Sequence, residues 1–86
     1  MKIKEGFLLR QVAGQNVVLP ASAELDLNMM ITLNDTGAFL WERLAEETDE
    51  AALVQALLAE YDVDEATAAA AVAAFVKKLY DHEFLV

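Results

Sequence analysis

Residues 27–33 alternate in a way that is typical of a half-buried β-strand. One face of such a strand would carry Leu27, Met29, Ile31 and Leu33, and the other face Asn28, Met30 and Thr32. At Asn34 the period changes to that of a helix, with an apolar stripe formed by Gly37, Leu40, Trp41 and Leu44. The pattern therefore predicts a strand that runs directly into a helix.

Asn34 is the predicted N-cap of this helix, because its side chain can accept a hydrogen bond from a free backbone N–H of the first turn. Asp35 follows it and places negative charge at the positive end of the helix dipole. Trp41 is interpreted as a core anchor, with a position at the edge of a ligand groove as the alternative.

Two earlier strands are predicted over residues 7–13 and 17–19, joined by a turn at residues 14–16, where glycine and asparagine tolerate positive φ. Pro20 should end the second strand because it lacks a backbone N–H. The third strand should cover residues 25–33. The simplest topology is an antiparallel meander with the third strand at one edge.

Three helices should follow the strands, the first over residues 35–46. Thr48 is the predicted cap of the second helix, and Asp64 that of the third, over residues 65–82. The buried line of the second helix is Leu53, Leu57 and Tyr61, and the apolar side of the third is Ala68, Val72, Phe75, Val76 and Leu79. Residues 84–86 form an apolar tail that should pack.

The fold class is α+β: one winged-helix-like domain over residues 1–86, with a three-stranded antiparallel sheet followed by three helices.

The composition narrows the classes of function. The chain has 86 residues, a net charge of −9 and no cysteine, which argues against a disulfide framework and against nucleic-acid binding. No segment resembles a signal peptide, and the longest apolar run, residues 68–76, is too short to span a membrane. We therefore expect a cytoplasmic protein that contacts neither nucleic acid nor membrane.

The residues suited to catalysis are few. His82 is the single histidine, and its neighbours Asp81 and Glu83 cannot face it on a helix, so it is interpreted as a helix-end residue rather than a metal ligand. The carboxylates around the first interhelical turn are interpreted as a solvated face. We expect no enzymatic activity, no cofactor and no metal.

The third strand is the candidate working part. Residues 27–33 contain none of the lysines, prolines or bulges that usually protect a sheet edge, and methionines suit a surface that binds varied apolar partners. The edge is either covered by the chain's own tail or by a second copy, or kept open to accept a peptide as a fourth strand. The predicted peptide-binding residues are Asn28, Met29, Met30, Ile31 and Thr32 of the strand, with Val72, Phe75, Val76 and Leu79 of the third helix.

The chain also resembles a known family. The motif Leu-Asn-x-Thr-Gly-Ala-x-x-Trp at residues 33–41, with Val-Leu-Pro at residues 18–20 and the apolar positions of the later helices, is similar to the PqqD family of peptide chaperones named for pyrroloquinoline quinone biosynthesis. The resemblance implies a three-stranded sheet with three helices. It also implies that the leader segment of a ribosomally made precursor peptide adds antiparallel to the third strand, and that a modifying enzyme, in that pathway a radical S-adenosylmethionine enzyme, receives it.

Two other functions stay open at this point. A winged-helix transcription regulator would share the fold, although the third helix carries no basic reading face. A homodimeric structural subunit would pair the open sheet edges about a two-fold axis. The client peptide is either the pyrroloquinoline quinone precursor or a related peptide.

Overall fold

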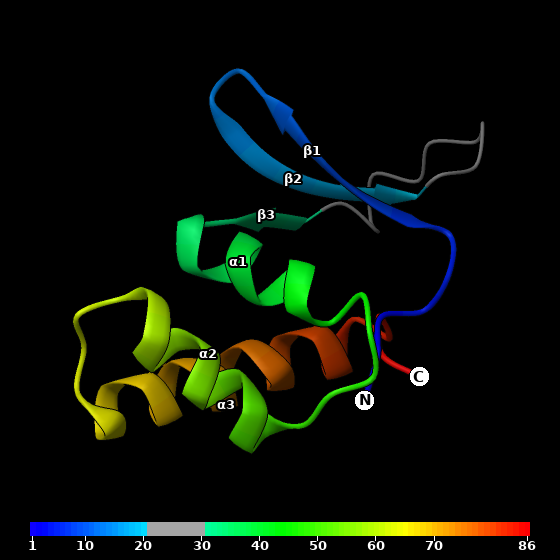
Figure 1. Ribbon diagram of the computed structural model, residues 1–86. Helices are drawn as coiled ribbons and strands as arrows, with labels where there is room; N and C mark the ends of the chain where they lie inside the picture. The colour runs from blue at the N-terminus through cyan, green and yellow to red at the C-terminus, as the bar shows by residue number, and fades with distance from the viewer. Residues whose placement is uncertain (21–30) are drawn as a thin grey trace.

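A sheet, a single helix and a helix pair follow one another down the molecule in Figure 1. The computed structural model describes residues 1–20 and 31–86. Its elements are β1 (Phe7–Val12), β2 (Gln15–Pro20), β3 (Ile31–Leu33), α1 (Asp35–Arg43), α2 (Glu50–Glu60) and α3 (Glu65–Asp81). The sheet is antiparallel with the order β1-β2-β3, which confirms the predicted α+β meander and the edge position of the third strand. The part of that strand predicted over residues 25–30 lies outside the described residues.

The turn of the hairpin lies one residue earlier than predicted. Ala13 and Gly14 have φ values of 53° and 80°, and Val12 pairs with Gln15 on either side of them. Positive φ at both central residues is the geometry that joins two strands with their natural twist. Gln15 and Asn16 therefore belong to β2, and the prediction of a turn over residues 14–16 was wrong. Pro20 is the last residue of β2, as expected.

Strand β3 passes into α1 through Asn34 alone. The Asn34 side chain accepts a hydrogen bond from the backbone N–H of Gly37 at 2.8 Å, which confirms the predicted cap. The predicted apolar stripe is buried, with Gly37, Leu40 and Trp41 in the helix and Leu44 at its C-cap. The helix ends at Arg43, earlier than the predicted residue 46.

The cap of α2 is Asp49 rather than Thr48. The Asp49 carboxylate accepts from the backbone N–H of Ala52 at 2.8 Å. The backbone N–H of Thr48 instead donates to the carbonyl of Met1 at 3.0 Å, so Thr48 belongs to the loop. For α3 the predicted cap is confirmed, because Asp64 accepts from the backbone N–H of Thr67 at 2.7 Å.

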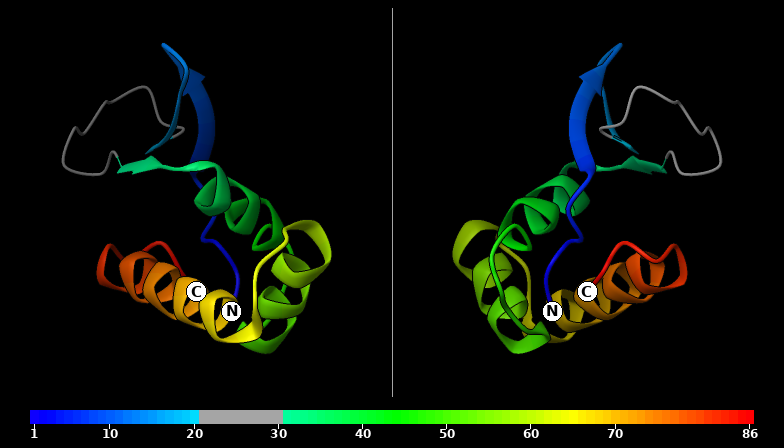
Figure 2. Two further views of the ribbon diagram at one scale, coloured as in Figure 1. Left: turned by 90° about the vertical axis from the view of Figure 1, so that its left-hand side faces the viewer. Right: turned by 90° about the vertical axis from the view of Figure 1, so that its right-hand side faces the viewer.

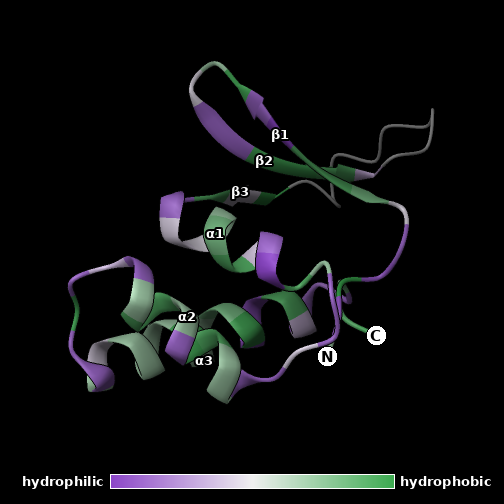
Figure 3. Cartoon of the chain, in the orientation of Figure 1, coloured by the Kyte–Doolittle hydropathy of each residue, from purple (hydrophilic) through white to green (hydrophobic). Residues whose placement is uncertain are grey.

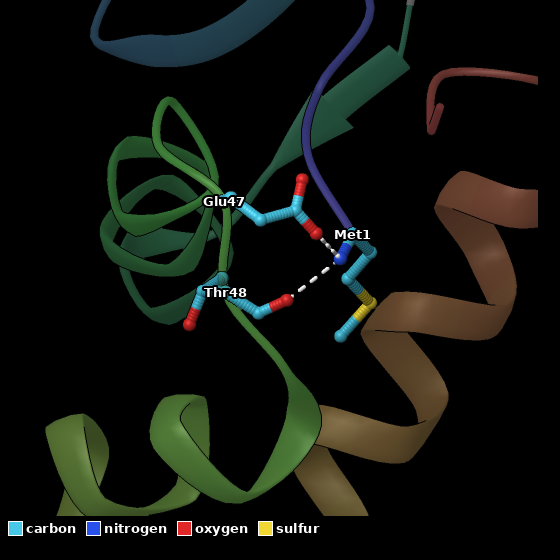
Figure 4. A network of polar contacts seen from close by, with 3 residues as sticks. All are labelled: Met1, Glu47 and Thr48. Carbon is cyan, nitrogen blue, oxygen red and sulfur yellow. Dashed lines mark hydrogen bonds and ion pairs between the residues drawn. The ribbon is translucent and has the colours of Figure 1, made fainter.

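The first residues of the chain link the α1–α2 loop to the C-terminal tail. The amino group of Met1 donates to the Thr48 carbonyl at 2.7 Å and pairs with the Glu47 carboxylate (Figure 4). On the other side, Ile3 forms an antiparallel bridge with Leu85. Segments from both ends of the described chain therefore close the same side of the core.

Phe84 is the largest fully buried side chain of the core. Its ring meets Phe7 edge to face at a centroid distance of 4.6 Å and Trp41 at 5.7 Å. Phe84 and Leu85 are buried as predicted, whereas Val86 is 81% exposed. Trp41 is buried, which confirms its interpretation as a core anchor. Figure 3 shows apolar colouring along much of α2 and α3 and on parts of β2 and β3.

A backbone motif at the end of α3 places Phe84 in the core. The backbone N–H of Phe84 donates to the Leu79 carbonyl at 2.9 Å, and that of Glu83 donates to the Tyr80 carbonyl at 3.0 Å. This hydrogen-bond pair is the Schellman motif, and the buried side chains of Leu79 and Phe84 supply its usual apolar contact. Glu83 occupies the left-handed position, with φ 59°, where glycine is the usual residue.

We expect Phe84→Ala to lower the free energy of unfolding by about 3–5 kcal/mol, because it leaves a cavity among Phe7, Trp41 and the helices. Urea denaturation followed by circular dichroism measures this change. Val86→Ala is the matched control and should change stability by less than about 0.5 kcal/mol, because Val86 is exposed. If Phe84→Ala lowered the free energy of unfolding only slightly, the Phe84 ring would not be a main contributor to the core.

We expect Glu83→Gly to raise the free energy of unfolding by about 0.5–1 kcal/mol, because glycine adopts the left-handed conformation without the steric cost of a Cβ. Glu83→Ala removes the same charge but keeps the Cβ, so it should bring no such gain. Denaturation of the three proteins side by side separates the backbone effect from the charge effect. Equal stabilities for the two variants would show that backbone strain at this position is negligible.

Candidate functional site: the groove between β3 and α3

A groove of about 560 Å³ runs between the end of β3, the start of α1 and one side of α3. Both views in Figure 2 show β3 lying over α3 at the edge of the sheet. The groove is lined by Thr32, Leu33, Asn34, Thr36, Gly37, Leu40, Ala71, Ala74, Phe75 and Lys78. It is therefore bounded by a sheet edge on one side and, on the other, by a helix that contributes two alanines, a phenylalanine and a lysine.

Gly37 sets the floor of this groove. A Cβ added to Gly37 would lie 3.2 Å from Oδ1 of Asn34, and 3.3 Å from both Cβ of Leu33 and Cε1 of Phe75. These separations are tighter than ordinary van der Waals contact, so the missing side chain lets the first turn of α1 approach the Phe75 ring. At Gly37, the end of β3, the first turn of α1 and α3 therefore pack against one another.

The backbone of Thr32 faces the outer edge of β3, where the described part of the chain adds no further strand. Val12 and Gln15 flank the tight turn and form a hydrogen-bonded pair, so Arg10 and Val17, two positions further along the ladder, do so as well. The N–H and C=O of Val17 are thus directed to β1, although Val17 is opposite Thr32 in the register. It follows that the N–H and C=O of Thr32 point away from β2.

Lys78 reaches this edge from α3. Its ammonium group donates a hydrogen bond to the Thr32 carbonyl at 3.3 Å. Among the described residues that line the groove, Lys78 carries the one formal charge, and none is a carboxylate. The groove thus combines outward backbone groups, an apolar wall and a cation, which is an arrangement that can accept an extended chain as an added strand.

The structure brings together some of the predicted binding residues but not all of them. Thr32 and Phe75 line the groove, whereas the side chain of Ile31 is buried under the sheet. Val72 and Leu79 are 1% and 0% exposed and belong to the core. Val76 is partly buried against that core. Asn28, Met29 and Met30 lie outside the described residues.

Sequence reasoning missed the side of α3 that faces the groove. The residues there are Ala71, Ala74, Phe75 and Lys78. They have the same helical spacing as the predicted set Val72, Phe75, Val76 and Leu79, but the set is shifted by one position around the helix. The lysine at the end of this stripe was the available signal, because a charged residue excludes that side from the core.

The remaining candidate residues lie away from the groove. His82 is the C-cap of α3, where its Nδ1 lies 2.8 Å from the Lys78 carbonyl and its ring stacks on Phe84. Glu42, Glu46, Glu47, Asp49 and Glu50 are exposed, as a solvated face should be. Within residues 1–20 and 31–86, no three acidic, histidine or cysteine side chains are placed to hold a metal ion. None of the helices described there is long and apolar enough to cross a bilayer.

Comparison with known proteins places this architecture in a family. A solved structure of TbiB1 in complex with the TbiA(beta) leader peptide matches with a TM-score of 0.75 and 26% identity, covering 99% of this chain and 94% of that one. A lasso peptide synthetase B1 complexed with its leader peptide matches with a TM-score of 0.69 and 26% identity, covering 93% and 89%. No curated protein sequence matches this chain.

The family model described as coenzyme PQQ synthesis protein D matches residues 15–85, which include β2, β3 and all three helices. This range contains every described residue of the groove. The resemblance drawn from the motif at residues 33–41 is therefore confirmed, and the chain belongs to the PqqD family.

Proposed function

We propose that this protein is a peptide chaperone that binds the leader segment of a ribosomally made precursor peptide and presents it to a modifying enzyme. The two similar solved proteins, TbiB1 and the lasso peptide synthetase B1, are both complexes with leader peptides. Family membership and near-complete coverage by those structures support the same role here. In the pathway that gives the family its name the modifying enzyme would be a radical S-adenosylmethionine enzyme.

The observation that carries this proposal is the edge of β3 beside the groove, on which no other described strand pairs. The N–H and C=O of Thr32 point out of the sheet, so an incoming peptide can pair with them as a fourth, antiparallel strand. Backbone pairing of this kind supplies affinity without regard to sequence. Selectivity then comes from the alternate side chains of the peptide that face α3.

The wall against which those side chains would rest is formed by α3. Ala71 and Ala74 leave room along the helix, and the ring of Phe75 provides an apolar surface between them and the strand. We therefore propose Thr32, Ala71, Ala74 and Phe75 as contact residues, together with the predicted Asn28, Met29 and Met30. Val72, Val76 and Leu79 would support this wall from behind rather than touch the peptide.

The protein's part in the reaction would be recognition and not catalysis. A short edge strand orders a flexible peptide, so entropy offsets much of the contact energy and the affinity should be modest, roughly micromolar. A carrier that must pass its client to an enzyme benefits from such reversible binding. Selection from a randomised peptide library displayed on ribosomes tests this proposal, because a strand-accepting groove should enrich extended peptides that the groove variants below fail to bind.

We expect Thr32→Pro to weaken binding of an enriched peptide by about tenfold, because proline removes one outward N–H worth about 1 kcal/mol and its ring crowds the edge. The fold should tolerate this change, since that N–H does not bond to β2. Gln11→Pro is the matched control, because the backbone of Gln11 faces the outer edge of β1 by the same alternation. Fluorescence anisotropy measures both affinities, and equal values for the two variants would remove strand addition at β3.

We expect Ala74→Trp to lower the affinity for an enriched peptide by about tenfold or more, because the indole would fill the space beside Phe75. Ala74 is exposed, so the fold should stay intact. Ala73→Trp introduces the same ring on the preceding residue, which is also exposed but does not line the groove, and this variant should bind like the wild type. Full binding by the Ala74 variant would place the peptide elsewhere.

A further inference from the structure

We propose that Lys78 makes the groove selective for a peptide that carries an aspartate or glutamate next to the residue paired with Thr32. This inference rests on the proposed strand addition and names the chemistry of its substrate. Its starting point is the hydrogen bond from the Lys78 ammonium to the Thr32 carbonyl, at 3.3 Å. In the absence of peptide, the lysine thus occupies the backbone position that an added strand requires.

An incoming strand changes the surroundings of this ammonium group. A peptide N–H that pairs with the Thr32 carbonyl competes with Lys78 for the same oxygen, and the added backbone covers the side of the lysine that faced water. A charge that loses water and a hydrogen-bond acceptor is costly unless an anion replaces them. A carboxylate on the peptide would provide this anion and form a charge-assisted hydrogen bond.

The geometry of the sheet gives the position of that carboxylate. In an added strand, the residue opposite Thr32 directs its side chain to the exposed face on which the Thr32 side chain lies. The residues directly before and after it alternate to the other face, where α3 and Lys78 lie. An acidic side chain at one of these two neighbouring positions is therefore within reach of the ammonium group.

The overall charge of the protein makes this selectivity distinctive. The net charge is −9, so general electrostatic attraction would favour basic peptides. An acidic preference at one position would oppose this background and requires a local cation. Lys77, the neighbouring lysine, is held at 2.6 Å by Asp81 on the same helix and does not line the groove. Lys77 is thus a matched control for Lys78.

The test is a selection of peptides from a randomised library displayed on ribosomes, carried out with the wild type, Lys78→Met and Lys77→Met. Methionine keeps an unbranched apolar side chain at an exposed position, so the fold should persist, and a circular dichroism melt verifies this. We expect an acidic residue to be enriched at one position with the wild type and with Lys77→Met, and this enrichment to disappear with Lys78→Met. Lys78→Arg should retain it, because the charge is kept.

The most enriched peptide is then titrated beside its Glu→Gln or Asp→Asn analogue. We expect the amide to bind the wild type about tenfold more weakly, and to bind Lys78→Met within about twofold of the acidic peptide. The difference in affinity between the acidic peptide and its amide analogue should become smaller as the salt concentration is raised. Because Lys78→Met frees the Thr32 carbonyl, the amide peptide should also bind this variant more tightly than it binds the wild type.

The outcomes separate the two proposals. If no peptide is enriched with the wild type, or if enriched peptides bind Thr32→Pro equally well, strand addition itself fails. If peptides are enriched and depend on Thr32 but show no acidic position, the role of Lys78 is overturned while the proposed function stands. An acidic position that persists with Lys78→Met overturns it in the same way.

Discussion

The close approach of α1 to Phe75 at Gly37 is the constraint on which the groove depends. A methyl group at residue 37 would meet the side chains of Leu33, Asn34 and Phe75 at 3.2–3.3 Å, so even alanine requires a shift at this junction. One contact thereby sets how far the edge of β3 lies from α3. The same glycine donates its backbone N–H to the Asn34 cap, so the groove spacing and the start of α1 are determined together.

A strand that enters a helix through one residue transmits this constraint to the sheet. Asn34 directly follows β3 and is the N-cap of α1, so the strand cannot rotate without losing the cap. The register with β2 then fixes the direction in which the Thr32 backbone points. A peptide would consequently meet a preformed edge, and the entropy lost on binding would come mainly from the peptide.

The alternation at residues 31–33 and the change of period at Asn34 predicted the end of the third strand, the cap and the direct passage into a helix. These features could be predicted because each signal is local. A strand repeats its side-chain direction two residues along the chain, and the Asn34 cap accepts from the backbone N–H three residues later. The choice of binding residues on α3 depended on tertiary packing. Both Val72-Phe75-Val76-Leu79 and Ala71-Ala74-Phe75-Lys78 are stripes of one helix, and the packing of α3 on α2 and on the rest of the core decides which one is buried. Hydrophobicity identified the stripe that packs, whereas the stripe that lines the groove contains two alanines and a lysine.

The edge of β3 also depends on a contact that the sequence of the strand does not reveal. An edge without lysine, proline or bulge in its own strand is usually a site of unwanted pairing. Here a lysine from α3, far along the chain, donates a hydrogen bond to the edge carbonyl of Thr32. A lysine within the strand would block every added strand equally, because it would stay at the edge. Under the proposed selectivity, a lysine on a neighbouring helix would move aside when an anion accompanies the incoming backbone, so a single side chain would disfavour chance pairing and still admit an acidic peptide.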